Sequence, residues 1–520
     1  MCLSGRRALI AIVILASALR LYPLWFGLPY PEARPDEETA VAKAMAITSG
    51  DFNPHFFHWP SLTFYAFAAA YAAATSVVGP LTPGQQIIIG RALVATAGTL
   101  TVLVLFWIGR RVADEETGLL AAFFLAIAVL HVRDSHFAMT DVPMTLLAMV
   151  SLAALLRALD TRPDVALPWF AAAGFAAGLA TSTKYSAAAL IAAMGAAQVM
   201  VLANGERPWH ARAWLPSVLF AAMMLCGFVV GTPYALLDYP AFATDFHYDV
   251  THLSGGHANL VLGRGWVYHL THSLPYGAGL SLFVAALAGV APLLRRFARP
   301  ALVVAAFGAA FYAAIGSGYT VFFRYILPLI PLLCLSAAVA VRVASQALAR
   351  RAGLSLAAAT TVVTVLVAGP TLVTSVWMDV LLSRTDTRVL AADWLNARIQ
   401  PGESLHDTGN GYTRLMVWKT SNRWTYDEAT GRFSGDASRV PDWLVVYQSP
   451  IRAYAAAPAA LRTLAATHYQ LAHTVRGTRG LAALAVYDRQ DAFFLPFSRL
   501  HTVERPGPTV QIYRRTNPSP

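Results

Sequence analysis

The chain is poor in cysteine and in charge, and it shows no internal repeat. Its 520 residues include three cysteines, Cys2, Cys226 and Cys334, which form no CxxC pair. This number excludes a disulfide framework, and the spacing excludes the standard cysteine zinc motifs. Charged residues make up 13% of the chain, whereas a soluble protein carries nearer a quarter. The composition is therefore not that of an ordinary soluble protein.

Hydrophobic residues are abundant instead. They form 57% of the chain, and the mean hydropathy is +0.51, which predicts a polytopic membrane protein. The net charge is +11. We do not expect a nucleic-acid partner from this charge, because arginines at cytoplasmic loop ends produce the same excess.

Eleven apolar runs approach the ~20 residues that cross a bilayer, some of them with help from their flanks. They lie at 8–28, 91–109, 117–131, 141–157, 167–183, 185–203, 214–231, 275–294, 301–318, 325–345 and 354–376. Arginine pairs such as Arg110-Arg111 and Arg350-Arg351 fall in alternate loops, which the positive-inside rule makes cytoplasmic. We therefore predict a multi-pass protein of the plasma (inner) membrane, with a cytoplasmic N-terminus and an extracytoplasmic C-terminal domain.

Two segments allow a second interpretation. Arg6-Arg7, an apolar run and the small residues 16–18 resemble a signal peptide, but apolar residues continue to Leu28, which favours an uncleaved first span. Residues 61–79 are also apolar, yet counting them as a span would break the alternation of the arginine-bearing loops. We interpret them as a helix that lies at, or dips into, the outer face of the membrane.

The composition changes to that of a soluble domain beyond Trp377, so we divide the chain into a membrane domain, 1–376, and an extracytoplasmic domain, 377–520. In the second domain an amphipathic helix is predicted from Asp386 to Ile399. Short strands are predicted at Trp443–Tyr447, Leu484–Tyr487 and Val510–Tyr513. The predicted fold is mainly α: a membrane bundle of about eleven spans with outer juxtamembrane helices, and a small α/β domain at its C-terminal end.

Polar residues of opposite charge gather at the outer ends of different spans. The acids are Asp36, Glu37, Glu38, Asp134 and Asp141, the bases are Arg91, Arg133, Lys184 and Arg324, and the histidines are His55, His58, His131 and His136. Charges at the mouth of a membrane bundle are costly, and they commonly serve chemistry or ion handling. A carboxylate close to a hydroxyl can abstract its proton, and fixed cations can stabilise a departing phosphate. We expect a bundle to bring many of these side chains into one cavity.

Several of these residues also fit purely structural roles. Asp141 could cap the helix that it begins, Lys184 could be an interfacial anchor, and Arg324 a flanking residue. His55 and His58 could belong to an interfacial belt. The adjacent acids Asp36 and Glu37 have no comparable use at a membrane boundary.

The outer loop 232–274 is rich in histidine and aspartate, including Asp238, Asp245 and Asp249. Its spacings match no standard zinc pattern. We interpret the segment as a flexible, polar loop that covers the substrate.

Five stretches in this order resemble the GT-C superfamily of membrane glycosyltransferases. They are Pro35-Asp36-Glu37, Asn53 to Pro60, His131 to Asp141, Gly178 to Tyr185, and Phe323 to Pro328. The resemblance is to the branch of protein O-mannosyltransferases and lipid A aminoarabinose transferases (family 39-like and 83-like), and it covers about residues 8–345. The chain lacks a clear lysine beside Trp59-Pro60, which departs from the aminoarabinose transferases.

The resemblance implies a polyprenyl-phosphate sugar donor, used from the outer leaflet, and a lipid, glycan or protein acceptor. It assigns catalytic roles to Asp36, Glu37 and Asp141, and a role in holding the donor phosphate to Lys184 and Arg324. The remaining candidates for the substrate site are Tyr325, His55, His58, Arg133, Asp134 and His136. A lipid phosphate leaves without an acid, so one base, Asp36, suffices for transfer with inversion. We expect no required cofactor and assign no metal ligands, although the use of a divalent metal ion stays an alternative.

Two other functions fit parts of the pattern. A transporter or lipid flippase would also carry intramembrane charge, but its site would lie at mid-depth, often between inverted repeats. A non-catalytic envelope protein could use its outer domain to bind a partner. A single outward-facing polar pocket favours the transferase.

Overall fold

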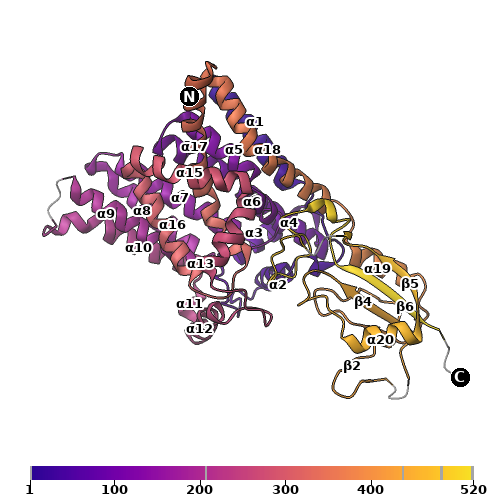
Figure 1. Ribbon diagram of the computed structural model, residues 1–520. Helices are drawn as coiled ribbons and strands as arrows, with labels where there is room; N and C mark the ends of the chain where they lie inside the picture. The colour runs from indigo at the N-terminus through magenta and orange to yellow at the C-terminus, as the bar shows by residue number, and fades with distance from the viewer. Residues whose placement is uncertain (1–2, 205–207, 436–438, 481–483, 517–520) are drawn as a thin grey trace. The chain divides into compact units, whose positions relative to one another are not determined.

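A computed structural model describes residues 3–204, 208–435, 439–480 and 484–516. Contacts divide the chain into two compact units. The first unit contains Met1–Leu24, Thr39–His257 and Val261–Val376, and the second contains Trp25–Glu38, Ala258–Leu260 and Trp377–Pro520. Helices build the first unit, and a sheet with helices builds the second (Figure 1). The second unit thus includes two short segments, 25–38 and 258–260, that precede its main stretch in the sequence.

The helical part begins with α1 (Leu3–Leu21), α2 (Glu37–Thr48), α3 (Leu62–Val78), α4 (Pro83–Val112), α5 (Glu115–Ile127), α6 (Val129–Asp134), α7 (Asp141–Leu159), α8 (Pro163–Thr181) and α9 (Leu190–Ala203). It continues with α10 (Leu215–Gly231), α11 (Tyr234–Leu237), α12 (Tyr239–Gly255), α13 (Gly265–Tyr268), α14 (Leu274–Ala278), α15 (Leu280–Arg296), α16 (Ala298–Gly316), α17 (Ile330–Ala352) and α18 (Leu356–Leu382). Short 3-10 or π turns lie between these helices: η1 (Pro31–Ala33), which belongs to the second unit, and η2 (Tyr185–Ala189), η3 (Ala211–Trp214), η4 (His269–Ser273) and η5 (Phe323–Leu329).

Seven helical stretches of the described chain are long and apolar enough to cross a membrane. They are Pro83–Val112, Asp141–Leu159, Tyr185–Ala203, Ala211–Gly231, Ala298–Gly316, Phe323–Ala352 and Leu356–Asn396. The pair Gly265–Ala278 and Leu280–Arg296, bent by 114°, can be counted as an eighth. The expected eleven spans correspond to these eight together with α1, α5 and α8. Those three helices are weaker candidates for membrane spans. The α1 helix carries three arginines, α5 has only 13 residues, and the apolar part of α8 is short because it begins at Val165.

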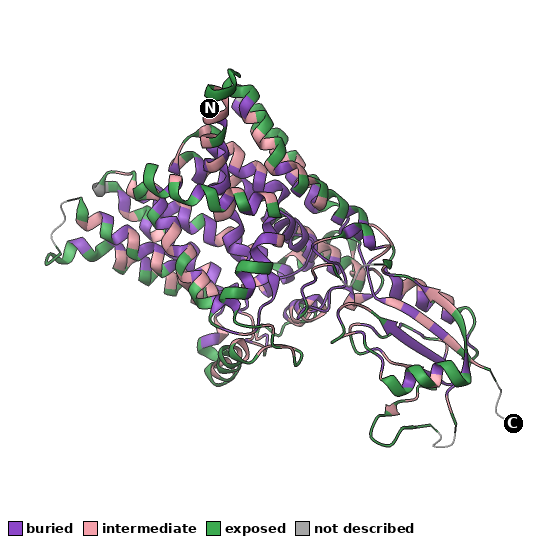
Figure 2. Ribbon diagram, viewed as in Figure 1, coloured by how far each residue is buried: buried purple, intermediate pink, exposed green. Residues whose placement is uncertain are grey.

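Several of these helices expose apolar side chains, as lipid-facing helices do. The α18 helix has little of its apolar stretch buried and appears largely green in Figure 2. Leu225 on α10 and Leu366 on α18 are 65% and 68% exposed. The predicted fold class, a helical membrane bundle with a small C-terminal sheet domain, is confirmed. The chain is a multi-pass membrane protein.

Close packing of α8 against α10 depends on glycine. A Cβ at Gly178 would lie 2.1 Å from the carbonyl oxygen of Met224, and one at Gly227 would lie 2.4 Å from that of Phe175. Small residues let membrane helices approach in this way. The end of α8 also holds the start of α3, since Leu62 N donates to Ser182 O at 3.1 Å. The helix expected over 61–79 is therefore present, and its first turn is bonded to the end of α8.

We predict that Gly178→Leu destabilises the bundle, because the new side chain must push α10 away. Overpacking of this kind costs about 1–3 kcal/mol or more. The melting temperature of the protein in detergent should fall clearly below that of the wild type. Gly195→Leu on α9 is the control, because nothing lies within 4 Å of a Cβ there, and an equal loss in both variants would contradict the prediction.

The second unit is built around a four-stranded sheet of order β1-β4-β6-β5. Its elements are α19 (Thr387–Asn396), β1 (Leu405–Asp407), β4 (Trp443–Gln448), α20 (Ala459–His468), β5 (Tyr469–Val475), η7 (Leu500–Thr502) and β6 (Thr509–Arg515), and a separate hairpin pairs β2 (Tyr426–Asp427) with β3 (Arg432–Phe433). The β1–β4 pair is parallel, and the other two pairs of the sheet are antiparallel.

The two faces of β4 are covered by different helices. Val445 packs with Leu395 of α19, whereas Leu444 and Val446 pack with Ala465 of α20. Figure 1 shows α19 and α20 on opposite sides of the sheet. Both faces are buried, which explains why β4 reads as a continuous apolar run, Trp443 to Tyr447, rather than as an alternating one.

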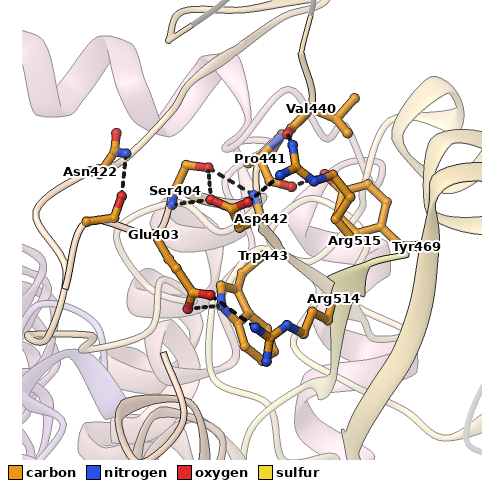
Figure 3. A network of polar contacts seen from close by, with 11 residues as sticks. Glu403, Ser404, Asn422, Val440, Pro441, Asp442, Trp443, Tyr469, Arg514 and Arg515 are labelled. Carbon is orange, nitrogen blue, oxygen red and sulfur yellow. Dashed lines mark hydrogen bonds and ion pairs between the residues drawn. The ribbon is translucent and has the colours of Figure 1, made fainter. Parts of the chain in front are cut away.

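A polar network closes one end of this sheet (Figure 3). The Asp442 carboxylate accepts from the Ser404 hydroxyl at 2.7 Å and from Arg515 at 2.7 Å. Glu403 accepts from the Trp443 indole at 2.9 Å and pairs with Arg514 at 3.1 Å. The network connects the residues before β1 and β4 with the end of β6.

Two local expectations are wrong. Leu484–Tyr487 is not a strand; Tyr487 instead belongs to the core that α19 covers. Segment 232–274 is not a flexible loop, since it forms α11, α12, α13, the π turn η4 and the start of α14. The signal for α12 was the spacing of four residues between Asp245 and Asp249, which places like side chains on one helix face.

Candidate functional site

The first unit brings an acid and a base of the predicted site into direct contact. Asp141 is the first residue of α7, and Lys184 lies between α8 and η2. The Lys184 ammonium pairs with the Asp141 carboxylate, whose side chain is 3% exposed. Asp141 does not act as the N-cap, which is Thr140. Lys184 is 19% exposed and turned toward Asp141, so its ammonium does not serve as an outward anchor.

Residues from η5 and α6 surround this ion pair. Lys184 lies 4.6 Å from the centre of the Tyr325 ring, and the charges of Arg324 and Asp134 also act on its ammonium. Arg324 is 8% exposed, and its guanidinium lies 4.4 Å from the centre of the Phe322 ring. The cluster therefore holds two cations at one end of α7, with aromatic rings beside them.

Arg133 and Asp134 form a second buried pair next to this cluster. Arg133 Nε donates to Asp134 Oδ1 at 2.8 Å, and the two side chains are 0% and 4% exposed. Adjacent residues cannot usually face each other on a helix, but α6 ends at Asp134, where the chain turns. The pair leaves little net charge at this point of the site.

His58 is held by the acids of α12. Its ring nitrogens lie 3.2 Å from Asp249 Oδ1 and 3.8 Å from Asp245 Oδ1. Burial raises the pKa of Asp249 to about 6, and the His58 charge opposes that shift. The Lys184 charge also acts on Asp249. His58 and the α12 acids therefore border the Lys184 cluster.

The other two predicted histidines lie in different surroundings. His55 is 62% exposed in its side chain and lies 3.3 Å from Asp51. His136 is buried, and its two ring nitrogens contact the carbonyl oxygens of Val132 and Tyr22 at 2.9 Å. Burial lowers the pKa of His136 to about 4. Its ring connects α6 to the chain after α1, while His55 remains accessible to solvent.

Asp36 and Glu37 belong to the second compact unit, which contains Trp25–Glu38. Asp36 has φ +75°, a left-handed conformation that is uncommon for a residue with a Cβ. Glu37 is fully buried at the start of α2. Burial raises the pKa of Glu38 to about 7, and the charges of Asp36 and Glu37 raise it further against two backbone hydrogen bonds.

Sequence reasoning missed the buried Arg20. Its guanidinium donates to the carbonyl oxygens of Leu125 and Ala126 at 2.8 and 2.9 Å, and it lies 3.0 Å from His131 Nδ1. These contacts connect α1 to α5 and α6. An arginine inside the first apolar run was the available signal, because charge at such a position needs a buried partner.

Among the described residues, no group of three or more His, Cys, Asp or Glu side chains is arranged to hold a metal ion. The expectation that no metal is required stays a prediction.

A family model described as dolichyl-phosphate-mannose-protein mannosyltransferase matches residues 67–231. That stretch runs from α3 to the end of α10 and contains Asp141 and Lys184. No curated protein matches the sequence of the chain.

Two solved structures have the same fold. ArnT from Cupriavidus metallidurans in the apo state aligns with a TM-score of 0.56 at 18% identity, over 97% of both chains. The Archaeoglobus fulgidus oligosaccharyltransferase in the apo form aligns with a TM-score of 0.52 at 14% identity, over 76% of this chain. The chain spans 58% of the length of that oligosaccharyltransferase.

The first unit is thus a bundle of membrane-spanning helices with a charged cluster at the ends of several helices, and the second is a small sheet domain. The family match and the fold both support the resemblance to the GT-C superfamily of membrane glycosyltransferases that the motifs indicated. The resemblance drawn from its motifs is confirmed.

We predict that Lys184→Met destabilises the protein, because it leaves the Asp141 carboxylate buried without its cation. Breaking one side of a buried pair costs about 3–5 kcal/mol. The double variant Asp141→Leu/Lys184→Met should recover part of this loss in thermal unfolding. Asp160→Asn is the control, because its pair with Arg111 is 52% exposed at the aspartate. A double variant less stable than Lys184→Met would contradict the pairing.

We also predict a pH-dependent stability that Glu38 controls. In the folded protein the pKa of Glu38 is about 7, whereas the unfolded chain loses this proton near the ordinary glutamate pKa of 4.5. The wild type should therefore lose stability relative to Glu38→Gln as the pH rises from about 4.5 to 7, and the difference should stay constant above pH 7. Melting temperatures of both proteins between pH 4 and 8.5 measure this. A difference in melting temperature that does not change with pH would exclude the raised pKa of Glu38.

Proposed function

We propose that this protein is a glycosyltransferase that moves a sugar from a polyprenyl-phosphate donor to an envelope acceptor, with inversion, on the extracytoplasmic side. The observation that carries the proposal is the cluster of Lys184, Asp141, Tyr325 and Arg324. It combines cations for a phosphate with an aromatic ring. The acceptor class, whether lipid, glycan or protein, is left open by this arrangement.

Lys184 and Arg324 would take the charge of the leaving group. As the bond between the anomeric carbon and the phosphate oxygen breaks, the phosphate keeps the electron pair, and negative charge accumulates on it. Preformed cations that meet such charge lower the barrier. Asp141 keeps the Lys184 side chain fixed before the donor arrives, so its placement costs little entropy during the reaction.

Asp36 would accept the proton of the acceptor hydroxyl while the hydroxyl oxygen bonds to the anomeric carbon. Its positive φ supports this role, because strained backbone conformations of this kind cluster at functional sites. A lipid phosphate needs no protonation to leave, so a second catalytic acid is unnecessary. In this scheme Glu37, which is fully buried, helps to hold Asp36 in place.

The two ends of α7 support a membrane orientation in which its Asp141 end faces outward. Asp141, at its first residue, belongs to the charged cluster, while Asp160, just beyond its last residue, pairs with Arg111 at 2.9 Å. A cavity at that second end is also lined by Asn204 and Arg299. Arginine-rich ends lie in the cytoplasm, and α7 is about 28 Å long. This orientation would put the Lys184 cluster at the extracytoplasmic surface.

Relatives of this fold have been solved with lipid phosphates. ArnT from Cupriavidus metallidurans was solved bound to undecaprenyl phosphate, with a TM-score of 0.51 to this chain at 18% identity. The Archaeoglobus fulgidus oligosaccharyltransferase was solved with a dolichol-phosphate and an inhibitory peptide. These ligands support a polyprenyl-phosphate donor for this chain and leave the sugar open.

We predict that Asp36→Asn abolishes transfer, because an amide cannot accept the proton. General-base catalysis contributes about 100-fold or more, so turnover should fall by at least that factor. Transfer from undecaprenyl-phosphate-linked hexoses and pentoses to envelope material in membranes measures it. Asp427→Asn, on the exposed hairpin of the second unit, should be as active as the wild type. Near-normal turnover of Asp36→Asn would remove Asp36 from this role.

A further inference from the structure

The segment that carries the adjacent acids Asp36 and Glu37, called the acidic pair below, packs with the C-terminal domain. Trp25–Glu38 forms one compact unit with Trp377–Pro520, and its regular structure consists of the short turn η1 and the first two residues of α2. The segment folds tightly on itself: Gly27 has φ +73°, and a Cβ there would lie 2.1 Å from that of Ala33. The position of its backbone therefore depends on its contacts with residues of the C-terminal domain.

The first anchor is a buried ion pair. Arg34 Nη1 lies 2.9 Å from Asp491 Oδ1, and the side chains are 1% and 2% exposed. The Arg34 guanidinium also lies 5.9 Å from the centre of the Phe493 ring. Asp491 is the partner of a side chain only two residues before Asp36. Removing one member of such a pair leaves a buried charge uncompensated.

The second anchor is Arg388, at the start of α19. Its Nε and Nη2 donate to the two carboxylate oxygens of Asp386 at 2.8 and 2.7 Å, which fixes the guanidinium plane. The Cζ atom of Arg388 lies 4.5 Å from the centre of the Tyr30 ring, and Nη2 donates to Ala33 O at 3.4 Å.

Tyr30 is itself tied to the domain, because its hydroxyl donates to Gly411 O at 3.1 Å. The two anchors thus hold the segment at Tyr30, Ala33 and Arg34. Asp36 follows directly, with its positive φ, and Glu37 after it is fully buried.

We infer that Asp491 and Arg388 are positioning residues that hold the acidic pair in its reactive geometry. The inference rests on the proposed function, in which Asp36 is the base. A displacement of about 1 Å at a reacting group costs up to about 100-fold in rate, so losing an anchor should reduce kcat and leave the binding of the donor lipid intact.

The test uses the full chain in lipid nanodiscs with three variants, Asp491→Asn, Asp491→Glu and Glu504→Gln. Asp491→Asn should lower kcat by about 10- to 100-fold per folded molecule, with KM for the undecaprenyl-phosphate sugar within about twofold. Asp491→Glu keeps the charge and should restore part of kcat. Glu504→Gln removes the exposed pair with Arg479 in the same domain and should behave as the wild type.

A second readout does not depend on turnover. Amide hydrogen exchange over residues 27–38 should accelerate in Asp491→Asn and remain unchanged in Glu504→Gln, because only the first loses the anchor. Unchanged exchange in Asp491→Asn would overturn the anchoring. Faster exchange with normal kcat would overturn the positioning role. A wild type that transfers no sugar from any of the donors would instead remove the proposed function, and exchange would still decide the anchoring.

Discussion

Charge buried among apolar helices must be paired, and this constraint shapes the first unit. Lys184 pairs with Asp141, Arg133 with Asp134, and Arg20 with carbonyl oxygens at the end of α5. An unpaired charge in such surroundings costs several kcal/mol. The Lys184–Asp141 pair and the Arg20 contacts each join different elements, so they fix the positions of those elements relative to one another.

Local patterns in the sequence predicted the membrane bundle and two strands correctly, because hydropathy and apolar runs are local properties. They did not predict α12, since the polar residues of 239–255 resemble a loop by composition. Nor did they predict that 25–38 joins the C-terminal domain. Arg34 and Asp491 are 457 residues apart, and nothing near Asp491 in the sequence marks it as the partner of the acidic segment.

The candidate site shows the same division. Residue types and their expected side of the membrane were sufficient to select Asp141, Lys184 and Arg324 as members of one set. They could not distinguish a cap or an anchor from an ion pair, because that depends on where side chains 43 positions apart point. His136 was selected by its motif, yet its ring is engaged by two backbone carbonyls, a contact that no sequence pattern reports.

The pairing of Asp141 also separates the roles of the acids. One Asp141 oxygen is already engaged by the Lys184 ammonium, and Glu37 is fully buried, so neither is well placed to receive a proton from an incoming hydroxyl. Asp36 is partly exposed and held at an unusual backbone angle. In the proposed transfer the leaving group is a lipid phosphate that needs no acid, so one partly exposed carboxylate would meet the chemical requirement. The other acids can then serve to fix the cation and the backbone around it.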